Sequence, residues 1–258
     1  MSILFLTNSL LTTVQDLGRK NFRRFGINPN GAMDQAAARL VNLLIGNDEN
    51  EAVLELHFPA PKILFEEKAL FALGGANFGA RLDGQRFFEN WQPVYAPKGS
   101  VLKFPEKVFG NRVYLAVRGG FRIEKWLSSA STNLKAEIGG FDGKRLQKDD
   151  RLFFKESSLN EKRRTNFKVS RQLIPPYSSF PTLRVTGGAE FEKLTADSRR
   201  SFQTQNFVIR HESDRMGFRL RGVSIKLQKN LELVSSAVGF GTVQLLPDGQ
   251  LIVLMADH

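Results

Sequence analysis

The sequence predicts a mainly β protein with few helices. Its apolar residues gather in short runs that are rich in β-branched residues, leucine or phenylalanine, and Gly, Pro, Asn or Asp bounds each run. The clearest such runs are 52–58, 69–73, 113–117, 231–234 and 251–255. Only one segment shows a clear helical periodicity, so helices are expected to be a minor part of the fold.

The N-terminal stretch is expected to be the first strand. It contains no Lys or Arg before Arg19, so it lacks the charged start of a secretory signal, and it is too short to cross a bilayer. No later apolar run approaches membrane length. We therefore expect a soluble protein without a membrane partner.

The clearest helical segment covers residues 34–44. Four apolar residues recur there at the spacing of one buried helix face: Ala37, Leu40, Val41 and Leu44. Gly46 and Asn47 supply a stop signal. Asp34 then lies in the first turn, where the helix dipole stabilises a carboxylate by about 0.3–1 kcal/mol. Asp34 is thus either a helix-terminus residue or a site residue.

The later part of the chain suggests two β units in tandem. The segments FALGGANF at 71–78 and RVTGGAEF at 184–191 share a Gly-Gly-Ala core. A polar, charged segment at 155–172 lies between them and is followed by two prolines, which is typical of a linker. We predict a first unit over 1–170, with the linker at its end, and a second unit over 171–258.

The composition narrows the range of possible partners and of possible site chemistry. The net charge of +11 and the pI near 10.0 favour attraction to anions, but the basic residues are scattered, with one dense cluster at 162–164. The 22 phenylalanines suit core filling better than base stacking, so no nucleic acid partner is expected. The absence of cysteine excludes disulfides and thiolate chemistry, and it fits a reducing, cytoplasmic location.

The common catalytic motifs are missing. His57, His211 and His258 have no metal-like spacing, so no metal is expected in this chain. No G-x-S-x-G elbow accompanies the serines at 127–133, and no glycine-rich stretch matches a P-loop. The strongest candidate for a functional turn is SDRMGFRLRG at 213–222, where arginine forks suit a carboxylate or phosphate.

Several blocks, in order along the whole chain, resemble the allophanate hydrolase subunit 2 family. These blocks are TVQDLGR at 13–19, GAMD at 31–34, LLIGN at 43–47, YLAVRGGF at 114–121, SSAST at 128–132, GGFDGKRL at 139–146, SDRMGFRLRG at 213–222 and GTVQLLPDGQLIVLMADH at 241–258. The family includes the C subunit of 5-oxoprolinase, also called KipA, and the matching half of the carboxyltransferase domain of urea amidolyase.

The resemblance implies tandem cyclophilin-like β-barrel units with a few short helices. It also implies a subunit of an ATP-dependent 5-oxoprolinase, which opens 5-oxoproline to glutamate and is active only in a complex. The implied partners are a KipI-like B subunit and a LamB/YcsF-like A subunit, and the implied substrate is a small amide or lactam. ATP is then used by the complex, since the chain has no nucleotide motif.

Two alternative functions stay open at this stage. One is the carboxyltransferase component of a biotin-dependent urea carboxylase or allophanate hydrolase system. The other is a noncatalytic KipA-type regulator of a KipI-like kinase inhibitor. Family members generally continue beyond the ADH sequence at 256–258, so the second unit is expected to be truncated at its C-terminus, with the strand at 251–255 at an exposed sheet edge.

The candidate site residues lie in the matched turns. Activation of an amide needs a positioned acid or base and donors for the developing negative charge. We predict Asp34 and Asp214 as catalytic groups that orient or transfer protons, and Arg19, Arg215 and Gln244 as substrate-binding groups. The structural alternatives are a turn-stabilising Asp16–Arg19 pair, a support network around Asp214 and Arg215, and an interior hydrogen bond for Gln244. Asp248 is expected in a hairpin turn.

Overall fold

The computed structural model describes residues 1–84, 86–155, 168–178, 181–229 and 238–258. The chain divides into two compact units. Unit 1 comprises Met1–Phe25 and Asn30–Pro181, and unit 2 comprises Gly26–Pro29 and Thr182–His258. The chain therefore passes between the units near residue 26 as well as after residue 181. The strand predicted at 231–234, the basic cluster at 162–164 and most of the predicted linker lie outside the described residues.

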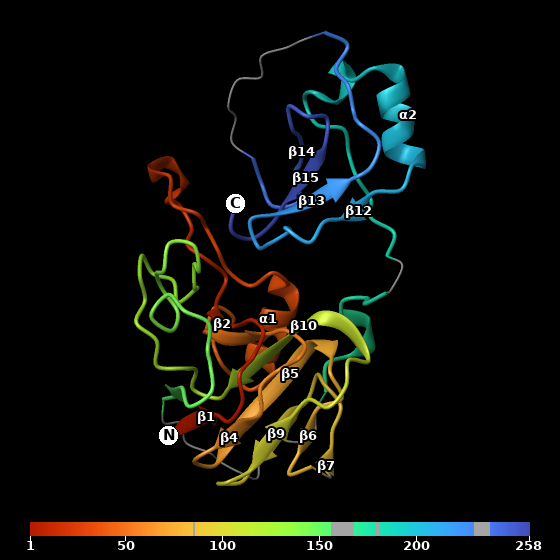
Figure 1. The fold of residues 1–258 in the computed structure, drawn as a ribbon. Coiled ribbons are helices and arrows are strands. Elements are labelled where there is room, and N and C mark those ends of the chain that lie inside the picture. Colours follow the sequence, from red (N-terminus) through yellow and green to blue (C-terminus); the bar gives the residue numbers. More distant parts are fainter. Residues whose placement is uncertain (85, 156–167, 179–180, 230–237) are drawn as a thin grey trace. The chain divides into compact units, whose positions relative to one another are not determined.

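Unit 1 contains two antiparallel sheets (Figure 1). The first has the order β11-β1-β4-β9-β6-β7, and the second has the order β2-β3-β10-β5-β8. The strands of the first sheet are β1 (Ser2–Phe5), β4 (Ile63–Phe65), β6 (Arg81–Leu82), β7 (Arg86–Phe87), β9 (Val101–Lys103) and β11 (Arg151–Phe153). The strands of the second are β2 (Thr12–Gln15), β3 (Val53–Leu56), β5 (Ala69–Asn77), β8 (Pro93–Ala96) and β10 (Phe109–Val117). The mainly β prediction is confirmed.

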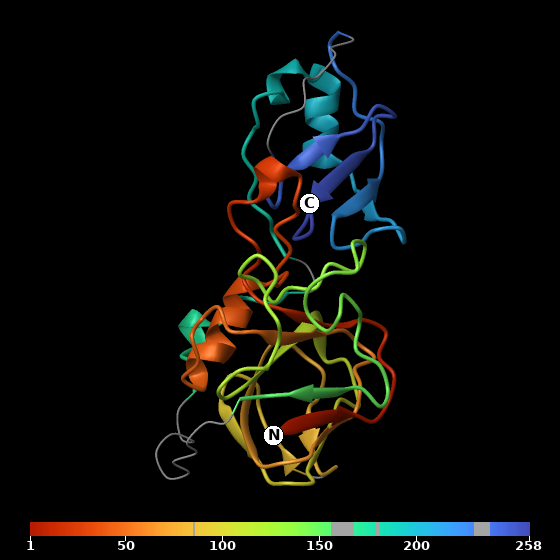
Figure 2. The ribbon, with the colours of Figure 1, turned by 90° about the vertical axis from the view of Figure 1, so that its left-hand side faces the viewer.

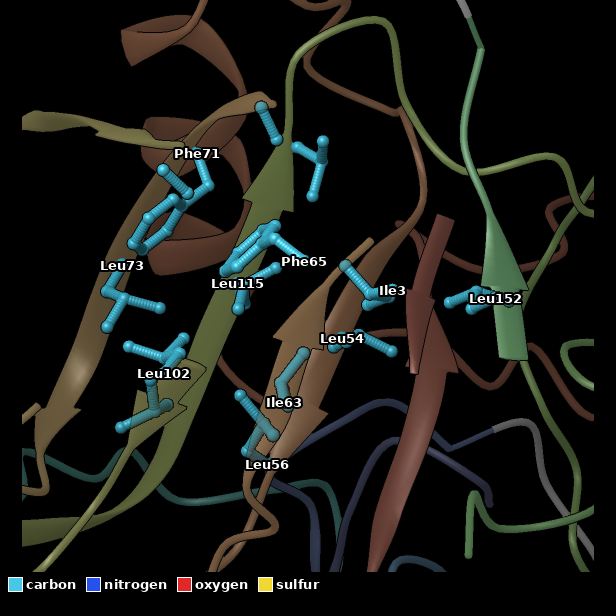
Figure 3. Close-up of a cluster of buried hydrophobic side chains, with 14 of the residues drawn as sticks. Ile3, Leu54, Leu56, Ile63, Phe65, Phe71, Leu73, Leu102, Leu115 and Leu152 are labelled. Carbon is cyan, nitrogen blue, oxygen red and sulfur yellow. The ribbon is translucent and has the colours of Figure 1, made fainter. Parts of the chain in front are cut away.

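The main core of unit 1 lies between these two sheets. Figure 3 shows side chains of both sheets pointing into it, among them Ile3 and Phe65 of the first sheet and Leu54, Phe71 and Leu115 of the second. Figure 2 shows β1, in red, beside β11, in green, where Ser2 pairs with Phe153. Phenylalanine thus fills the core, as the composition predicts.

The predicted helix forms as α1 (Gln35–Leu44), which packs on the outer face of the second sheet. Strand β5 and residues 113–117 of β10 are buried on both faces, because their side chains divide between the main core and the cluster beneath α1. On β10, Leu115 belongs to the main core, whereas Tyr114 and Ala116 belong to the cluster beneath α1. This outer face carries a polar network that is described below.

Unit 2 contains one antiparallel sheet of order β12-β13-β15-β14, formed by Val208–Ile209, Gly217–Arg221, Leu251–Leu254 and Val243–Leu245. Its helix α2 (Ala196–Thr204) was not predicted. Only Ser198 of α2 is buried, so the helix lacks the apolar face that sequence periodicity detects. The three short 3-10 helices of the described chain are η1 (Arg23–Phe25), η2 (Arg171–Leu173) and η3 (Phe191–Lys193).

Two expectations for unit 2 were wrong. The strand predicted at 251–255 is not at an edge, because β15 pairs with β13 on one side and with β14 on the other. The Gly-Gly-Ala echo does not mark equivalent strands. Its first copy lies in the buried strand β5, whereas residues 184–188 form no strand and Val185 is exposed. The Gly-Gly-Ala core and the phenylalanine that follows it are too few shared residues to determine a strand when the flanking residues differ.

Candidate functional site

Asp16 is the centre of a buried polar cluster in unit 1. Its Oδ1 accepts hydrogen bonds from the hydroxyls of Ser129 (2.7 Å) and Ser131 (2.6 Å) and from the amide of Gly18 (2.8 Å). Its Oδ2 accepts from the amide of Ala130 (2.6 Å). These four hydrogen bonds satisfy the oxygens of a side chain that is buried away from water. It fixes the SSAST segment at 128–132 against the QDLGR turn.

Arg19 lies beside this cluster and is itself buried, with 1% of its surface exposed. Its Nη1 donates to Asn30 Oδ1 (2.7 Å), its Nη2 donates to the carbonyl of Ser131, and its guanidinium lies 4.9 Å from the ring centroid of Trp126. Asp16 and Arg19 therefore both hold Ser131. The interpretation of this pair as a turn-stabilising group is consistent with these contacts, and a role of Arg19 in substrate binding stays a prediction.

Two glycines allow the backbone to close around Arg19. Gly139 has φ +70°, and a Cβ there would overlap both Arg19 Nη2 and the Ser131 carbonyl. Gly31 has φ +103°, and a Cβ there would lie 3.0 Å from the amide nitrogen of Gly18. Both positions need glycine for its positive φ and for the close approach. The first glycine of the GAMD block and the first glycine of the GGFDG block are thus explained by this packing.

Asp34 caps α1 and also holds a distant tyrosine. Its Oδ1 accepts from the amide of Ala37 (2.9 Å), which places Asp34 at the N-cap, one residue before the first turn. Its Oδ2 accepts from the hydroxyl of Tyr177 (2.7 Å). Burial, together with this hydrogen bond and the carboxylate charge, raises the pKa of Tyr177. The expected helix-terminus role is confirmed, and a catalytic role remains a prediction.

Tyr177 is itself held between two aromatic rings. Its ring stacks on Trp91 at 6.4 Å between centroids and on Phe109 at 5.8 Å. The backbone nearby is also fixed, since the amide of Val169 donates to the carbonyl of Trp91. The stretch from 168 to 178 therefore packs on the rest of unit 1 beside the N-terminus of α1.

A buried glutamate, Glu55 on β3, anchors the GAMD segment. Its Oε2 accepts from the amide of Met33 (2.9 Å) and from the hydroxyl of Tyr114 (2.8 Å), which lies opposite it on β10. The hydroxyl of Tyr114 in turn accepts from the amide of Asp34 (2.8 Å). Burial and the charge of Glu55 raise the pKa of Tyr114 well above its usual value. Glu55 and Tyr114 therefore set the position of Asp34.

The second oxygen of Glu55 faces two basic groups. Its Oε1 lies 3.5 Å from Arg112 Nε and 3.8 Å from His57 Nε2. Both nitrogens are buried, and neither has a hydrogen-bond partner among the described residues. The contact between His57 and Glu55 is therefore at an ion-pair distance and is not a hydrogen bond.

In unit 2, Arg215 forms a buried ion pair that the sequence did not reveal. Its Nε and Nη2 lie 3.1 Å and 3.0 Å from the two carboxylate oxygens of Asp257, and both side chains are buried. The amide of Asp257 donates to the Arg215 carbonyl (2.8 Å), and Asn28 Nδ2 donates to the Asp257 carbonyl. A support network thus exists around Arg215, with Asp257 as the carboxylate.

Asp214 and Gln244 are both exposed. Asp214 Oδ1 accepts from the amides of Met216 (2.8 Å) and Gly217 (3.3 Å), so it shapes the turn before β13. Gln244 lies on the edge strand β14, which β15 separates from β13. Asp248 Oδ1 accepts from the amide of Gln250 (3.0 Å) within the β14–β15 connection, which confirms the predicted hairpin turn.

The predicted residues are divided between the two units, with Arg19 and Asp34 in unit 1 and Asp214, Arg215 and Gln244 in unit 2. In unit 1, the segment 30–34 connects the two: Asn30 accepts a hydrogen bond from Arg19, and the amide of Asp34 donates to the hydroxyl of Tyr114. In unit 2, Arg215 is buried, whereas Asp214 and Gln244 are exposed on different strands or turns. Sequence reasoning missed Glu55, Tyr114 and Tyr177. A charged residue within the apolar run 52–58 was the one available signal for Glu55.

The described residues contain no group of three or more His, Asp or Glu side chains that could hold a metal ion. Within the same residues, neither helix has the length and apolarity needed to cross a membrane.

The comparisons with known proteins agree on one family. A family model described as carboxyltransferase domain, subdomain A and B, matches residues 25–258. The C subunit of 5-oxoprolinase from Haemophilus influenzae is 36% identical over 245 residues, which cover 95% of this chain and 76% of the relative. The urea amidolyase of Saccharomyces cerevisiae is 31% identical over 219 residues, 82% of this chain but only 12% of that protein.

Among solved structures, the urea carboxylase of Kluyveromyces lactis matches 99% of this chain and 24% of its own, with a TM-score of 0.85 and 24% identity. At that identity the match speaks for the fold. The fold match and the family model, which covers most of the chain, are both consistent with the ordered sequence blocks and with the β architecture. This chain belongs to the family of the carboxyltransferase domain, subdomain A and B.

Proposed function

We propose that the chain is the C component of an ATP-dependent 5-oxoprolinase, which opens the lactam ring of 5-oxoproline to give glutamate. It acts with a KipI-like subunit and a LamB/YcsF-like subunit, and the complex is cytoplasmic. The observation that carries the proposal is the 36% identity to the C subunit of a 5-oxoprolinase over 95% of this chain. Similarity over nearly the full chain is stronger support than any single motif.

The chemistry asks for a positioned carboxylate near a polarised amide. Ring opening breaks the bond between the carbonyl carbon and the ring nitrogen, adds a water oxygen to that carbon and leaves a proton on the nitrogen. Asp34 is our first candidate for orienting the water or transferring the proton, because Glu55 and Tyr114 fix its backbone and Tyr177 fixes its side chain. Asp214 is the exposed second candidate.

Substrate binding is assigned to Arg19, Arg215 and Gln244. The substrate carboxylate needs a cationic partner and its amide needs a donor and an acceptor. Gln244 is exposed and can meet a ligand directly. Arg19 and Arg215 are buried and hydrogen-bonded within the chain, so in this proposal they contribute through their positive charge and through the turns that they hold.

The N-termini of α1 and α2 do not suit a nucleotide phosphate. The N-terminus of α1 is capped by the carboxylate of Asp34, whose charge repels phosphate. The N-terminus of α2 is capped by Thr195, and Asp197 lies in its first turn. We therefore assign ATP to another member of the complex, and no step in this chain involves it.

Reconstitution with the purified KipI-like and LamB/YcsF-like subunits tests the proposal through ATP hydrolysis that depends on 5-oxoproline. The complete mixture is expected to turn over, and omission of this chain is expected to abolish turnover. Absence of turnover in a complete mixture of folded subunits would contradict the proposal.

Asp34→Asn tests the proposed role of that carboxylate. Asparagine caps helices as well as aspartate does, so the variant keeps the fold but loses the charge. We expect a rate reduction of at least about 100-fold for loss of an acid–base group, with an unchanged melting temperature. Asp48→Asn is the matched control, since Asp48 also accepts a local amide, from Asn50 (2.9 Å), at an exposed turn. Equal rates for the two variants would remove Asp34 from the mechanism.

The carboxyltransferase component of a biotin-dependent urea carboxylase is the second candidate. It is favoured by the description of the matched family and by the identity of 31% to a urea amidolyase. Biotin would then be carried by another domain or polypeptide. Urea-dependent ATP consumption in a mixture with a biotin carboxylase and its biotin carrier, without 5-oxoproline turnover, would establish this alternative.

A further inference from the structure

The segment from Lys20 to Pro29 leaves the candidate site and returns to it. Arg19 precedes this segment and Asn30 follows it, and the 2.7 Å hydrogen bond between their side chains closes its base. Gly31 packs against the backbone of Gly18 at the same point. A loop whose ends are joined in this way is an Ω-type loop. Residues 20–25 of this loop belong to unit 1, and we refer to them as the basic loop tip.

The tip has a defined conformation. Asn21 turns the backbone with φ 73°, η1 follows, and Gly26 turns the backbone again with φ 73°. The amide of Phe25 donates to the carbonyl of Phe22 (2.9 Å) within the turn. Figure 1 shows this turn, in red, standing away from the strands of unit 1. Its side chains are therefore presented on a built support.

The chemistry of the tip is cationic and aromatic. Lys20, Arg23 and Arg24 are exposed, and the sequence contains no Asp or Glu between Asp16 and Asp34. The guanidinium of Arg24 lies 4.7 Å from the ring centroid of Phe25, and Phe25 is 63% exposed. The ring of Phe25 is therefore available for contact with another molecule, next to the guanidinium of Arg24. Arginine and aromatic residues together are the composition of binding hot spots between proteins.

We propose that the basic loop tip is the docking element for an acidic surface of the KipI-like subunit. Arg24 and Phe25 form the anchor of this contact, with Phe25 entering a pocket and Arg24 meeting a carboxylate at its rim. The inference rests on the proposed function, which requires a partner. The inference also deepens the proposed function, because the hydrogen bond between Arg19 and Asn30 that shapes the candidate site also fixes the base of the docking loop.

The test measures by calorimetry how two double variants bind the purified KipI-like subunit. Arg24→Ala/Phe25→Ala removes the anchor. Arg81→Ala/Phe87→Ala is the matched control, because Arg81 and Phe87 pair across β6 and β7 and Phe87 is 61% exposed. We expect the first to raise Kd at least about 10-fold and the second less than about 2-fold. Arg24→Glu should weaken binding further, and wild-type Kd should rise with salt.

Several outcomes would overturn the proposal. They are wild-type affinity in Arg24→Ala/Phe25→Ala, an equal loss in both double variants, and failure of the wild type to bind the KipI-like subunit. The proposal would also be overturned if Arg24→Ala/Phe25→Ala bound the KipI-like subunit as the wild type does but lost binding to a single-stranded RNA probe. Binding without 5-oxoproline turnover would instead contradict the proposed function, whereas turnover that is insensitive to the tip variants would contradict only the docking.

Discussion

Arg215→Met tests the energetic importance of the buried ion pair in unit 2. The variant keeps the length of the side chain but removes both bonds to Asp257, at 3.1 Å and 3.0 Å, and leaves that carboxylate buried. Breaking a buried pair on one side costs about 3–5 kcal/mol, because the remaining charge has lost its compensation. The stability of a whole domain is about 5–15 kcal/mol, so the loss is expected to be large.

The assay uses the placement of the two tryptophans. Trp91 and Trp126 both lie in unit 1, so tryptophan fluorescence reports the unfolding of that unit. Hydrogen exchange of the amides in β13 and β15 reports unit 2. Arg215→Met is expected to lower the exchange protection of these strands by the full 3–5 kcal/mol or so, while the fluorescence midpoint in urea stays unchanged.

The control is an exposed pair of the same geometry. Arg210 also contacts both oxygens of Glu212, at 3.2 Å and 2.8 Å, but both side chains are exposed. Arg210→Met is therefore expected to cost no more than about 1 kcal/mol. A loss below about 1 kcal/mol for Arg215→Met as well would refute the reasoning, and so would a failure of Arg215→Met/Asp257→Leu to recover stability.

Three further predictions concern unit 1. Gly139→Ala should cost about 1–3 kcal/mol more in urea unfolding than Gly46→Ala, since both have positive φ but only the first meets other atoms. Because the pKa values of Tyr114 and Tyr177 are raised, stability should fall as the pH rises above about 10, where tyrosines of the unfolded chain ionise, and in a Tyr95→Phe background, which keeps only these two tyrosines, absorbance at 295 nm should rise only on unfolding. Hydrogen bonds from an arginine and a serine lower the pKa of Glu66, so its contribution holds above about pH 4.5 and is lost on acidification, and Glu66→Gln should flatten that acid slope.

The sequence predicted what local patterns determine. The strands at 52–58, 69–73, 113–117 and 251–255 and the helix at 34–44 are present because short apolar runs bounded by turn residues, and a periodic apolar helix face, are local features of the sequence. The helix α2 left no such trace, since it buries almost nothing. The position of β15 within its sheet could not be predicted either, because strand order depends on pairings between distant segments.

The candidate site shows the same division. Asp34 was identified from its place before an apolar helix face, and its capping bond follows from that local context. Its partner Tyr177 is 143 residues away, and Arg215 meets Asp257 across 42 residues. Polar pairs of this kind are set by tertiary packing, so a motif can reveal one member without revealing the other. The nearby Asp214 was therefore the natural but incomplete choice of partner for Arg215.

The passage of the chain through unit 2 at Gly26–Pro29 bears on how the protein is made. Asn28 and Asp257, which are hydrogen-bonded to each other, are 229 residues apart. At about 5–20 residues per second, a ribosome needs on the order of 10–50 s to synthesise the stretch between them. During that interval the early segment must wait without its native neighbours, so the second unit can be completed only late in translation.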